Sequence, residues 1–240
     1  MKIKDNIPGN YQYWALHEAS PLRRSWHNNK LRLIELMMLP NSSDFVVDAG
    51  CGSGNVSAFL ADFCQSCLGI DIDPNAVQFA SKTYSGKNNL RFIESKFSDV
   101  PITNNTVDKI YCIEVIEHLD SSDIISMLDI FNNWLKVDGQ LLITTPNYRS
   151  LWPIIEWFSD TFALSPQMAN EQHITRFSPK SFAEILTMNR FSVNKLGSFN
   201  FMSPFIASLS WKTSLKLNNW EIMSISTIGN ILYALCTKRV

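Results

Sequence analysis

Three glycines spaced two apart, Gly50, Gly52 and Gly54, separate a short apolar run from a segment of helical composition. Glycine has no Cβ, so these positions let the backbone turn sharply and pass close to a bound ligand. Asp48 precedes the glycines, and Asp71 ends the next apolar run, 23 residues after Asp48. A carboxylate at the end of a second strand can accept hydrogen bonds from both hydroxyl groups of a ribose. The spacing therefore places a glycine turn and a carboxylate at the ends of neighbouring strands, where a ligand can bind.

A second group of reactive side chains follows a later apolar run. Glu114, Glu117 and His118 stand at i, i+3 and i+4, a spacing that places side chains on one face of a helical turn. His173 lies further along the chain, in the stretch EQHITRFS. Carboxylates and imidazoles suit Mg²⁺, Mn²⁺ or Zn²⁺, and a histidine alone can act as a general base near neutral pH. A divalent metal site, a general base and a plain cofactor-lining role for His118 are all compatible with the sequence.

Strands and helices that alternate along the chain must position both groups. Short, nearly continuous apolar runs predict strands at 44–49, 67–71, 90–94, 107–113, 140–145, 191–196 and 231–237. Apolar periodicity and helix boundary signals predict helices at 22–39, 55–63, 75–84, 124–135, 151–163 and 179–189. Strands this apolar are typical of a parallel sheet covered by helices on both faces. The sequence thus predicts an α/β fold with a doubly wound sheet.

Composition restricts the class of protein. The 240 residues are 45% hydrophobic and 18% charged, with a net charge of -1, which fits a globular chain and excludes a wholly disordered one. We expect one domain over 1–240, with a helical cap at 1–40 and insertions near 148–177 and 199–228. The chain has no run of four basic residues that would favour general nucleic-acid binding. Neither a signal peptide nor a membrane span is recognisable, so we expect a cytoplasmic protein.

The second insertion is unusually apolar. Met202, Phe205, Ile206 and Leu209 fall at i, i+3, i+4 and i+7, the spacing of one helix face. Apolar stripes at this spacing are usually part of a core, so extra core beneath a lid is the favoured interpretation. Two others stay open: an interfacial helix or apolar wall for a lipid-linked or aromatic substrate, and a dimer interface.

The glycine segment also resembles a known family. VVDAGCGSGN at 46–55 and GIDID at 69–73 resemble motif I and the second-strand acid of the class I, Rossmann-like S-adenosylmethionine-dependent methyltransferases, closest in motif to the type 11 and 12 methyltransferase domains. A nicotinamide dehydrogenase would need its third glycine one position later, where this chain has Asn55. The likeness extends over roughly residues 40–200. It implies a seven-stranded, mostly parallel sheet whose last strand is antiparallel.

The resemblance also implies a cofactor and its contacts. S-adenosylmethionine would be bound, and S-adenosylhomocysteine would be the product. The implied contacts are Asp48, Gly50, Cys51, Gly52, Gly54, Asp71, Ile72, Phe97, Ile113 and Glu114. Phe97 belongs to a loop that usually flanks the adenine in this family, and Lys96 stands where many members carry an acid.

The segment that contains Glu114, Glu117 and His118 has its own parallels. With TTPN at 144–147 and a downstream histidine, it resembles the small-RNA 3′-terminal 2′-O-methyltransferases, in which such residues hold a divalent metal. The ubiquinone-biosynthesis O-methyltransferases show a similar segment. The resemblance implies catalytic roles for Glu117, His118 and His173, with a divalent metal as the less favoured addition. The predicted function is methyl transfer to an oxygen of a small or lipid-like acceptor, and the alternative is a methyltransferase fold that serves as a binding or partner subunit without turnover.

Overall fold

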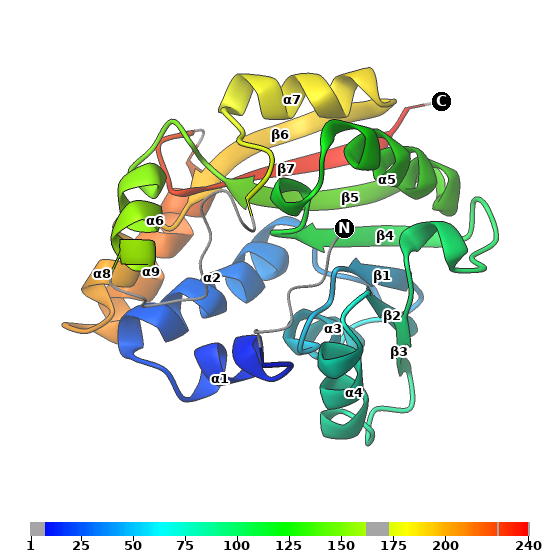
Figure 1. The fold of residues 1–240 in the computed structure, drawn as a ribbon, viewed down its shortest axis with the longest axis horizontal. Helices are drawn as coiled ribbons and strands as arrows, with labels where there is room; N and C mark the ends of the chain where they lie inside the picture. The colour runs from blue at the N-terminus through cyan, green and yellow to red at the C-terminus, as the bar shows by residue number, and fades with distance from the viewer. Residues whose placement is uncertain (1–7, 162–172, 225, 240) are drawn as a thin grey trace.

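A seven-stranded sheet forms the centre of the molecule, with helices on both faces (Figure 1). The computed structural model describes residues 8–161, 173–224 and 226–239. The strands are β1 (Phe45–Ala49), β2 (Ser66–Asp71), β3 (Leu90–Glu94), β4 (Val107–Ile113), β5 (Leu135–Pro146), β6 (Phe191–Phe199) and β7 (Ile231–Lys238). Their order is β3-β2-β1-β4-β5-β7-β6, and β7 alone runs antiparallel to its neighbours. The predicted α/β fold, with its antiparallel last strand, is confirmed.

The helices begin at recognisable signals. They are α1 (Tyr11–His17), α2 (Pro21–Met37), α3 (Asn55–Ala61), α4 (Pro74–Thr83), α5 (Ser121–Trp134), α6 (Trp152–Thr161), α7 (Pro179–Met188), α8 (Ser203–Ile206) and α9 (Trp211–Met223). Asp73 caps α4, where Pro74 takes the first position, and Asp120 caps α5 by accepting two backbone N–H groups. A side-chain oxygen at this place satisfies N–H groups that have no partner within the helix.

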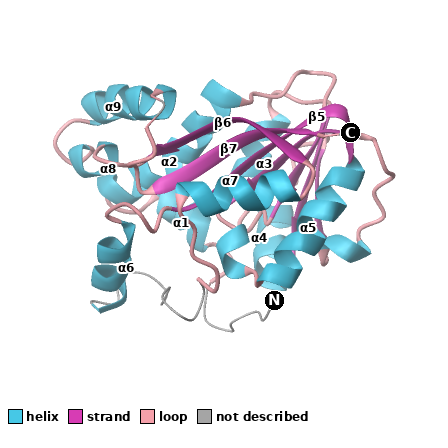
Figure 2. Cartoon of the chain, turned by 90° about the horizontal axis from the view of Figure 1, so that it is seen from above, coloured by secondary structure: helices cyan, strands magenta, loops and turns pink. Residues whose placement is uncertain are grey.

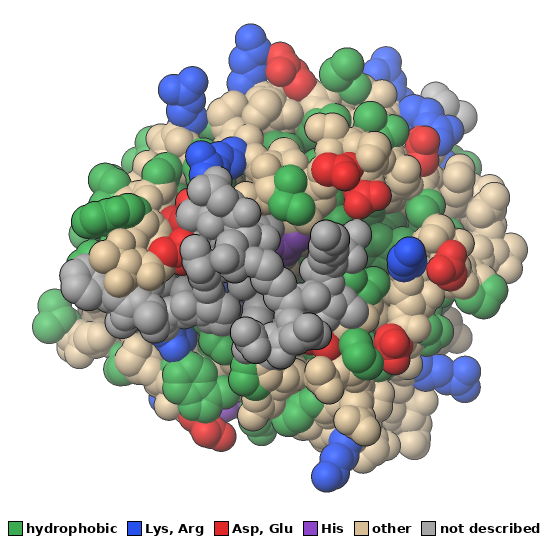
Figure 3. Space-filling model, viewed as in Figure 1, with side chains coloured by type: hydrophobic (Ala, Val, Ile, Leu, Met, Phe, Trp, Pro, Cys, Tyr) green, Lys and Arg blue, Asp and Glu red, His purple; other side chains and the backbone are tan. Residues whose placement is uncertain are grey.

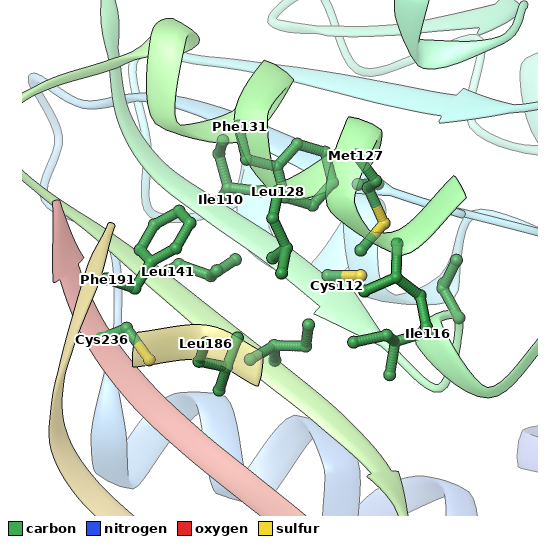
Figure 4. Packing of buried hydrophobic residues seen from close by; sticks show 14 of the residues in the cluster. Ile110, Cys112, Ile116, Met127, Leu128, Phe131, Leu141, Leu186, Phe191 and Cys236 are labelled. Atoms are coloured by element: carbon green, nitrogen blue, oxygen red, sulfur yellow. The ribbon is translucent and has the colours of Figure 1, made fainter. Parts of the chain in front are cut away.

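Two apolar clusters hold the helices against the sheet. On one face, Phe131 of α5 and Leu186 of α7 pack against Ile110 and Leu141 of the central strands (Figure 4). On the other face, Leu33 of α2 and its neighbours from α3 pack against β1 and β4. Figure 2 shows the sheet enclosed between these layers. Because both faces are covered, the strands can be almost wholly apolar, as the sequence indicates.

The order of the strands places the two predicted groups of reactive residues close together. β1 lies between β2 and β4, so the connections that leave β1 and β4 diverge at this point in the sheet. All three strands are parallel, and their carboxyl ends carry the glycine segment, Asp71 and Glu114. A crevice at such a switch point is where doubly wound sheets bind ligands.

Several element boundaries differ from the sequence prediction, most of them by one or two residues. The helix predicted at 124–135 ends at Trp134, and β5 begins at Leu135 rather than at residue 140. Asp138 adopts a φ of 64° inside this strand, and the pairing with β4 shifts register after Val107, so the expected turn is absorbed as a strand irregularity. β6 continues to Phe199, and residues 162–163 of the helix predicted at 151–163 lie outside the described residues.

The second insertion does not form the extra core that its periodicity favours. Only Ser203–Ile206 and Trp211–Met223 are helical, and Met202, Phe205 and Leu209 are exposed, Leu209 to 89%. The stripe fails as a core because α8 lies at the edge of the molecule, against α2 and α9 rather than over the sheet. Among the described residues, no helix combines the length and apolar character needed to cross a membrane.

Candidate active site

The glycine segment forms a tight loop joined to the end of β2. Gly50, Gly52 and Gly54 have φ values of 80°, 49° and 80°, a conformation that side chains disfavour. The Gly52 N–H donates to Asp71 Oδ2 at 2.8 Å, and the N–H of Asp73 donates to Asp71 Oδ1 at 3.0 Å. Burial raises the pKa of Asp71 despite these hydrogen bonds. The predicted loop and acid therefore meet, and each carboxylate oxygen of Asp71 retains lone pairs for further donors.

Asp48 holds the start of this loop in place. Its side chain is buried, and the Ser57 hydroxyl of α3 donates to Asp48 Oδ2 at 2.5 Å. Burial raises the pKa of Asp48 to about 7, although the Ser57 hydrogen bond opposes the shift. This contact ties the end of β1 to the start of α3, so the loop between them is held at both ends.

Two N-terminal helices close over the loop. Between them and the loop lies a cavity of about 30 Å³, far below the roughly 300–1,000 Å³ of pockets that hold small ligands. The cavity is lined by Gln12, Leu16, His27, Lys30, Leu31, Asp48, Gly50, Cys51, Asn55, Val56 and Ile113. Ser53 Oγ donates to the Gly9 carbonyl at 2.7 Å, and Asn55 Nδ2 donates to the Gln12 carbonyl at 2.8 Å. With α1 in this position, the cavity is therefore smaller than a site that holds a cofactor.

Glu114 lies beside this cavity in a strained conformation. Its φ is 56°, and its N–H donates to Thr144 Oγ1 at 3.0 Å. Its Oε2 forms an ion pair with Lys30 of α2, whereas its buried Oε1 accepts no hydrogen bond from the described residues. A buried carboxylate oxygen without a donor is costly. The arrangement fits a ligand that brings a positively charged amino group, as S-adenosylmethionine does.

The three predicted catalytic residues come together near the ends of β4 and β5. One potential ligand atom from each of Glu117, His118 and His173 lies within 4.8 Å of the others. The N–H groups of Ile174 and Thr175 donate to the Glu117 carbonyl at 2.8 and 3.0 Å, which brings His173 to this place. Carboxylate and imidazole ligands suit a divalent cation, and the same groups can exchange protons.

The expectation that Glu114 shares a helical face with Glu117 and His118 is wrong. Only Ile116–His118 form a turn, of 3₁₀ type, and Glu114 precedes it with a positive φ. The carboxylate of Glu114 therefore pairs with Lys30 and stands outside the group of three.

Glu117 is the buried carboxyl group among these three residues. Its side chain is 1% exposed, and Oε2 has no hydrogen-bond partner among the described residues. Burial raises the pKa of Glu117 to about 8, the nearby His173 lowers it, and Glu114 raises it further. The Glu117 carboxyl group is therefore mostly protonated at neutral pH and would ionise in the presence of a cation.

His173 is oriented by two side chains that the sequence did not single out. Its Nδ1 lies 2.6 Å from Glu156 Oε1, and the Tyr148 hydroxyl donates to the same oxygen at 2.7 Å. Burial raises the pKa of Glu156, but the hydrogen bonds from His173 and Tyr148 outweigh it and lower the pKa overall. An ionised carboxylate only accepts hydrogen bonds, so His173 carries its proton on Nδ1. Its Nε2 is left as the acceptor.

Other predicted contacts occupy different surroundings. Phe97 packs edge-on against Phe131 of α5, with ring centroids 5.4 Å apart, and Ile72 follows Asp71 in the chain. Neither is among the described residues that line the cavity. Conversely, no motif pointed to Lys30 or His27 of α2, although burial, Lys30 and Arg23 together hold the pKa of His27 well below its usual value.

Comparisons with known proteins agree with this geometry. Residues 46–139 match the family model of a methyltransferase domain. The chain is 22% identical over 157 residues to the methyltransferase YcgJ of Bacillus subtilis, covering 65% of this chain and 60% of YcgJ. It is 30% identical over 139 residues to the ubiquinone biosynthesis O-methyltransferase of Glaesserella parasuis, covering 55% of each.

The fold has a solved counterpart of similar topology. Haemonchus contortus phosphoethanolamine N-methyltransferase 1, solved with phosphoethanolamine and S-adenosylhomocysteine, superimposes with a TM-score of 0.67 at 17% identity, covering 98% of this chain and 46% of that one. This chain spans little more than half the length of the curated relatives named above. Residues 46–139 thus match a methyltransferase domain, and the glycine loop and the strand order give the chain the Rossmann-like fold of class I S-adenosylmethionine-dependent methyltransferases.

Proposed function

We propose that this chain transfers a methyl group from S-adenosylmethionine to an oxygen atom of a small or lipid-like acceptor, with His173 taking the acceptor's proton. The observation that carries the proposal is the pair formed by Glu156 and His173. A histidine whose Nδ1 is held by a buried carboxylate presents a basic Nε2, which is the arrangement that activates a hydroxyl group elsewhere in enzymes. An amine acceptor that arrives neutral has less need of such a base.

The cofactor site contributes binding and alignment. When bound, S-adenosylmethionine supplies an activated methyl group on sulfonium. Asp71 would accept hydrogen bonds from the ribose hydroxyls, and Glu114 would accept one from the amino group. Alignment of nucleophile, methyl carbon and sulfur supplies much of the rate enhancement in such a displacement, so the rigid loop from Gly50 to Gly54 contributes to the rate through geometry.

The acceptor site contributes proton removal. The acceptor oxygen would attack the methyl carbon, the carbon–sulfur bond would break with S-adenosylhomocysteine as the leaving product, and the hydroxyl proton would pass to Nε2 of His173. The ionised Glu156 stabilises the imidazolium that results, and His118 lies beside the same ring, with 5.3 Å between the ring centroids. General base catalysis of this kind contributes roughly 10²- to 10⁴-fold.

A divalent cation is the second candidate for the same place. Glu117, His118 and His173 offer a carboxylate and two imidazoles, and the unpartnered oxygen of Glu117 lacks a counter-charge. A cation there would lower the pKa of an acceptor hydroxyl. In that case Glu156 would hold His173 as a ligand instead of as a base.

We also propose that residues 1–240 act as a single domain, in which the helical cap at 1–40 covers the cofactor and the insertions near 148–177 and 199–228 shape the acceptor site. α1 and α2 line the cavity over the glycine loop, and Glu156 and His173 both come from the first insertion, which supports this division.

Two measurements test the proposal in sequence. Calorimetry with S-adenosylhomocysteine should show binding that Asp71→Ala abolishes. Transfer of isotope-labelled methyl groups should then be followed to simple phenols, with phosphoethanolamine as the amine comparison, with and without Mn²⁺. Labelling of the phenols that His173→Gln abolishes, with cofactor binding intact, would support the proposal. Labelling of the amine alone would refute oxygen transfer, and cofactor binding without transfer to any acceptor would favour the partner-subunit alternative.

A further inference from the structure

Helix α9 buries mostly polar residues, unlike an ordinary surface helix. Its buried residues are Ser214, Asn218, Glu221 and Ile222, so three of the four are polar. Surface helices of globular proteins normally bury an apolar stripe and expose polar residues. The buried face of α9 therefore does not explain the apolar content of the helix.

Two of the buried polar residues of α9, Ser214 and Glu221, form hydrogen bonds with specific partners. Ser214 Oγ donates to the Ser203 carbonyl at 2.7 Å. Glu221 Oε1 accepts from the N–H groups of Met202 and Ser203 at 2.9 and 3.0 Å, and its Oε2 accepts from the Ser203 hydroxyl at 2.8 Å. Hydrogen bonds to a buried carboxylate are among the stronger ones, so this orientation of α9 is fixed by contacts that rotation of the helix would break.

The outward side carries large apolar residues and lysines. We call Leu209, Lys212, Lys216, Trp220 and Met223 the α9 face. Leu209 is 89% exposed, Trp220 64% and Met223 57%, and both lysines are exposed. Figure 3 shows apolar side chains at the surface of this end of the molecule, and Figures 1 and 2 both place α8 and α9 beside one another there, next to α2.

The charge of this region has one sign. Between residues 200 and 224, Glu221 is the only acid, and it is buried and bonded as described above. Arg24 of α2 adds a further positive charge, with its guanidinium carbon 5.8 Å from the centroid of the Trp211 ring. Tryptophan, aliphatic residues and lysine on one exposed face are the composition of helices that lie in the interface of anionic membranes.

We propose that the α9 face docks on the surface of an anionic lipid bilayer. The side chains of Trp220 and Met223 enter the headgroup region, and Lys212 and Lys216 contact lipid phosphates. The alternative of a symmetric dimer through this face is disfavoured by charge, because a two-fold interface brings the same patch of both copies together. The lysines of the two copies would then face one another, and the face offers no exposed acid to pair with them.

Docking there would also bring the membrane close to the cofactor site. Arg32 of α2 donates to Asn219 of α9 at 2.7 Å, and the Ser25 and Ser214 hydroxyls lie 3.1 Å apart. The opposite side of α2 carries His27 and Lys30, which line the cavity over the glycine loop. One helix thus separates the docking face from the cofactor cavity. The docking proposal itself does not require methyl transfer.

Co-sedimentation with vesicles tests the proposal. The purified chain should bind vesicles of phosphatidylcholine containing phosphatidylglycerol, bind pure phosphatidylcholine weakly, and be released by salt. The double variant Trp220→Ser, Met223→Ser should bind at least about tenfold more weakly, and Lys212→Gln, Lys216→Gln roughly tenfold more weakly to the anionic vesicles only. Met188→Ser is the matched control, because Met188 is a methionine 80% exposed on α7, away from the α9 face.

The replaced side chains are exposed, so circular dichroism and the melting temperature should stay unchanged in all variants. No binding of the wild type to anionic vesicles would overturn the proposal, as would equal binding by the Trp220, Met223 variant. Sedimentation velocity gives a further check: a dimer that this variant dissociates would assign the face to a second copy and overturn lipid docking.

Discussion

The glycine loop and the two inserted segments of this molecule, near 148–177 and 199–228, are built in different ways. Around the glycine loop, the shape follows from local backbone demands: three positive φ values in five residues and an acid at the end of the next strand. In the insertions, the shape follows from contacts between distant residues, such as His173 with Glu156 and Glu221 with the chain near Ser203. The glycine loop can therefore be recognised as a sequence motif, whereas the shape of the inserted segments depends on which parts of the folded chain pack together.

This comparison predicts that a backbone change in the glycine loop has the largest effect on stability and on cofactor binding. A Cβ on Gly50 would lie 2.3 Å from Val115 Cγ2, and the φ of 80° is itself unfavourable. Gly50→Ala should lower the free energy of unfolding by about 4 kcal/mol and abolish calorimetric binding of S-adenosylhomocysteine. Gly86→Ala is the control, because a Cβ there meets nothing within 4 Å. Equal melting temperatures for the two variants would contradict this account.

Glu117 provides the next test, through pH. The unfolded carboxyl loses its proton near pH 4.5 and the folded one near pH 8. Between these values the unfolded chain binds fewer protons, so stability falls as pH rises. Glu117→Gln removes this loss, so between pH 4.5 and pH 8 the unfolding free energy of the variant should rise relative to that of the wild type by about 4 kcal/mol. Denaturant titrations at both pH values measure the gain, and parallel pH profiles would show that Glu117 ionises normally.

A substitution of Glu156 tests the contacts between distant residues in the inserted segments. Glu156→Gln keeps the size of the side chain but removes the charge that fixes the His173 tautomer and stabilises its imidazolium. We expect kcat to fall about 100-fold while the affinity for S-adenosylhomocysteine is unchanged. Glu184→Gln on the exposed side of α7 serves as the control. If the Glu156 variant retained full kcat with a normal pH profile, His173 would not be the base.

A smaller effect should appear at α1, which lies over the glycine loop. Ser53→Ala removes the hydrogen bond to the Gly9 carbonyl, which holds the chain before α1 closed over the loop. Because a single hydrogen bond contributes about 1 kcal/mol, the open form should become about fivefold more populated and the cofactor association rate should rise accordingly. Stopped-flow binding measures this rate. Ser126→Ala on the exposed side of α5, which loses a bond only to the Ser122 carbonyl, should leave it unchanged.

Much of the sheet was predictable because strands and helix boundaries leave local signals. β3 and β4 have the predicted bounds, and Pro74 begins α4 as expected. The start of β5 was not predictable, because the pairing of Leu135 with Val107 in β4 outweighs the turn signal at Asp138 and Gly139. Strand ends depend on such pairing, which the local sequence does not encode.

Within the candidate site, a single buried acid was the signal that sequence reasoning passed over. Glu156 interrupts an apolar helical stretch, WPIIEWF, where a lone charge requires a partner if that face is buried. Its partner His173 is 17 residues away, and Tyr148 is 8 residues away on the other side. Lys30 gives an even weaker signal, since a lysine in a helix is usually solvated and only the fold brings it to Glu114.

The sequence by itself determined the α/β fold, the glycine loop and the acid that faces it, because backbone conformation and strand burial act through neighbouring residues. Only the tertiary structure decided that Glu114 pairs with Lys30, that Glu156 orients His173, and that α9 turns its polar side inward. The physical reason is that hydrogen bonds and ion pairs between buried groups depend on distances that the chain acquires only when separate elements pack together.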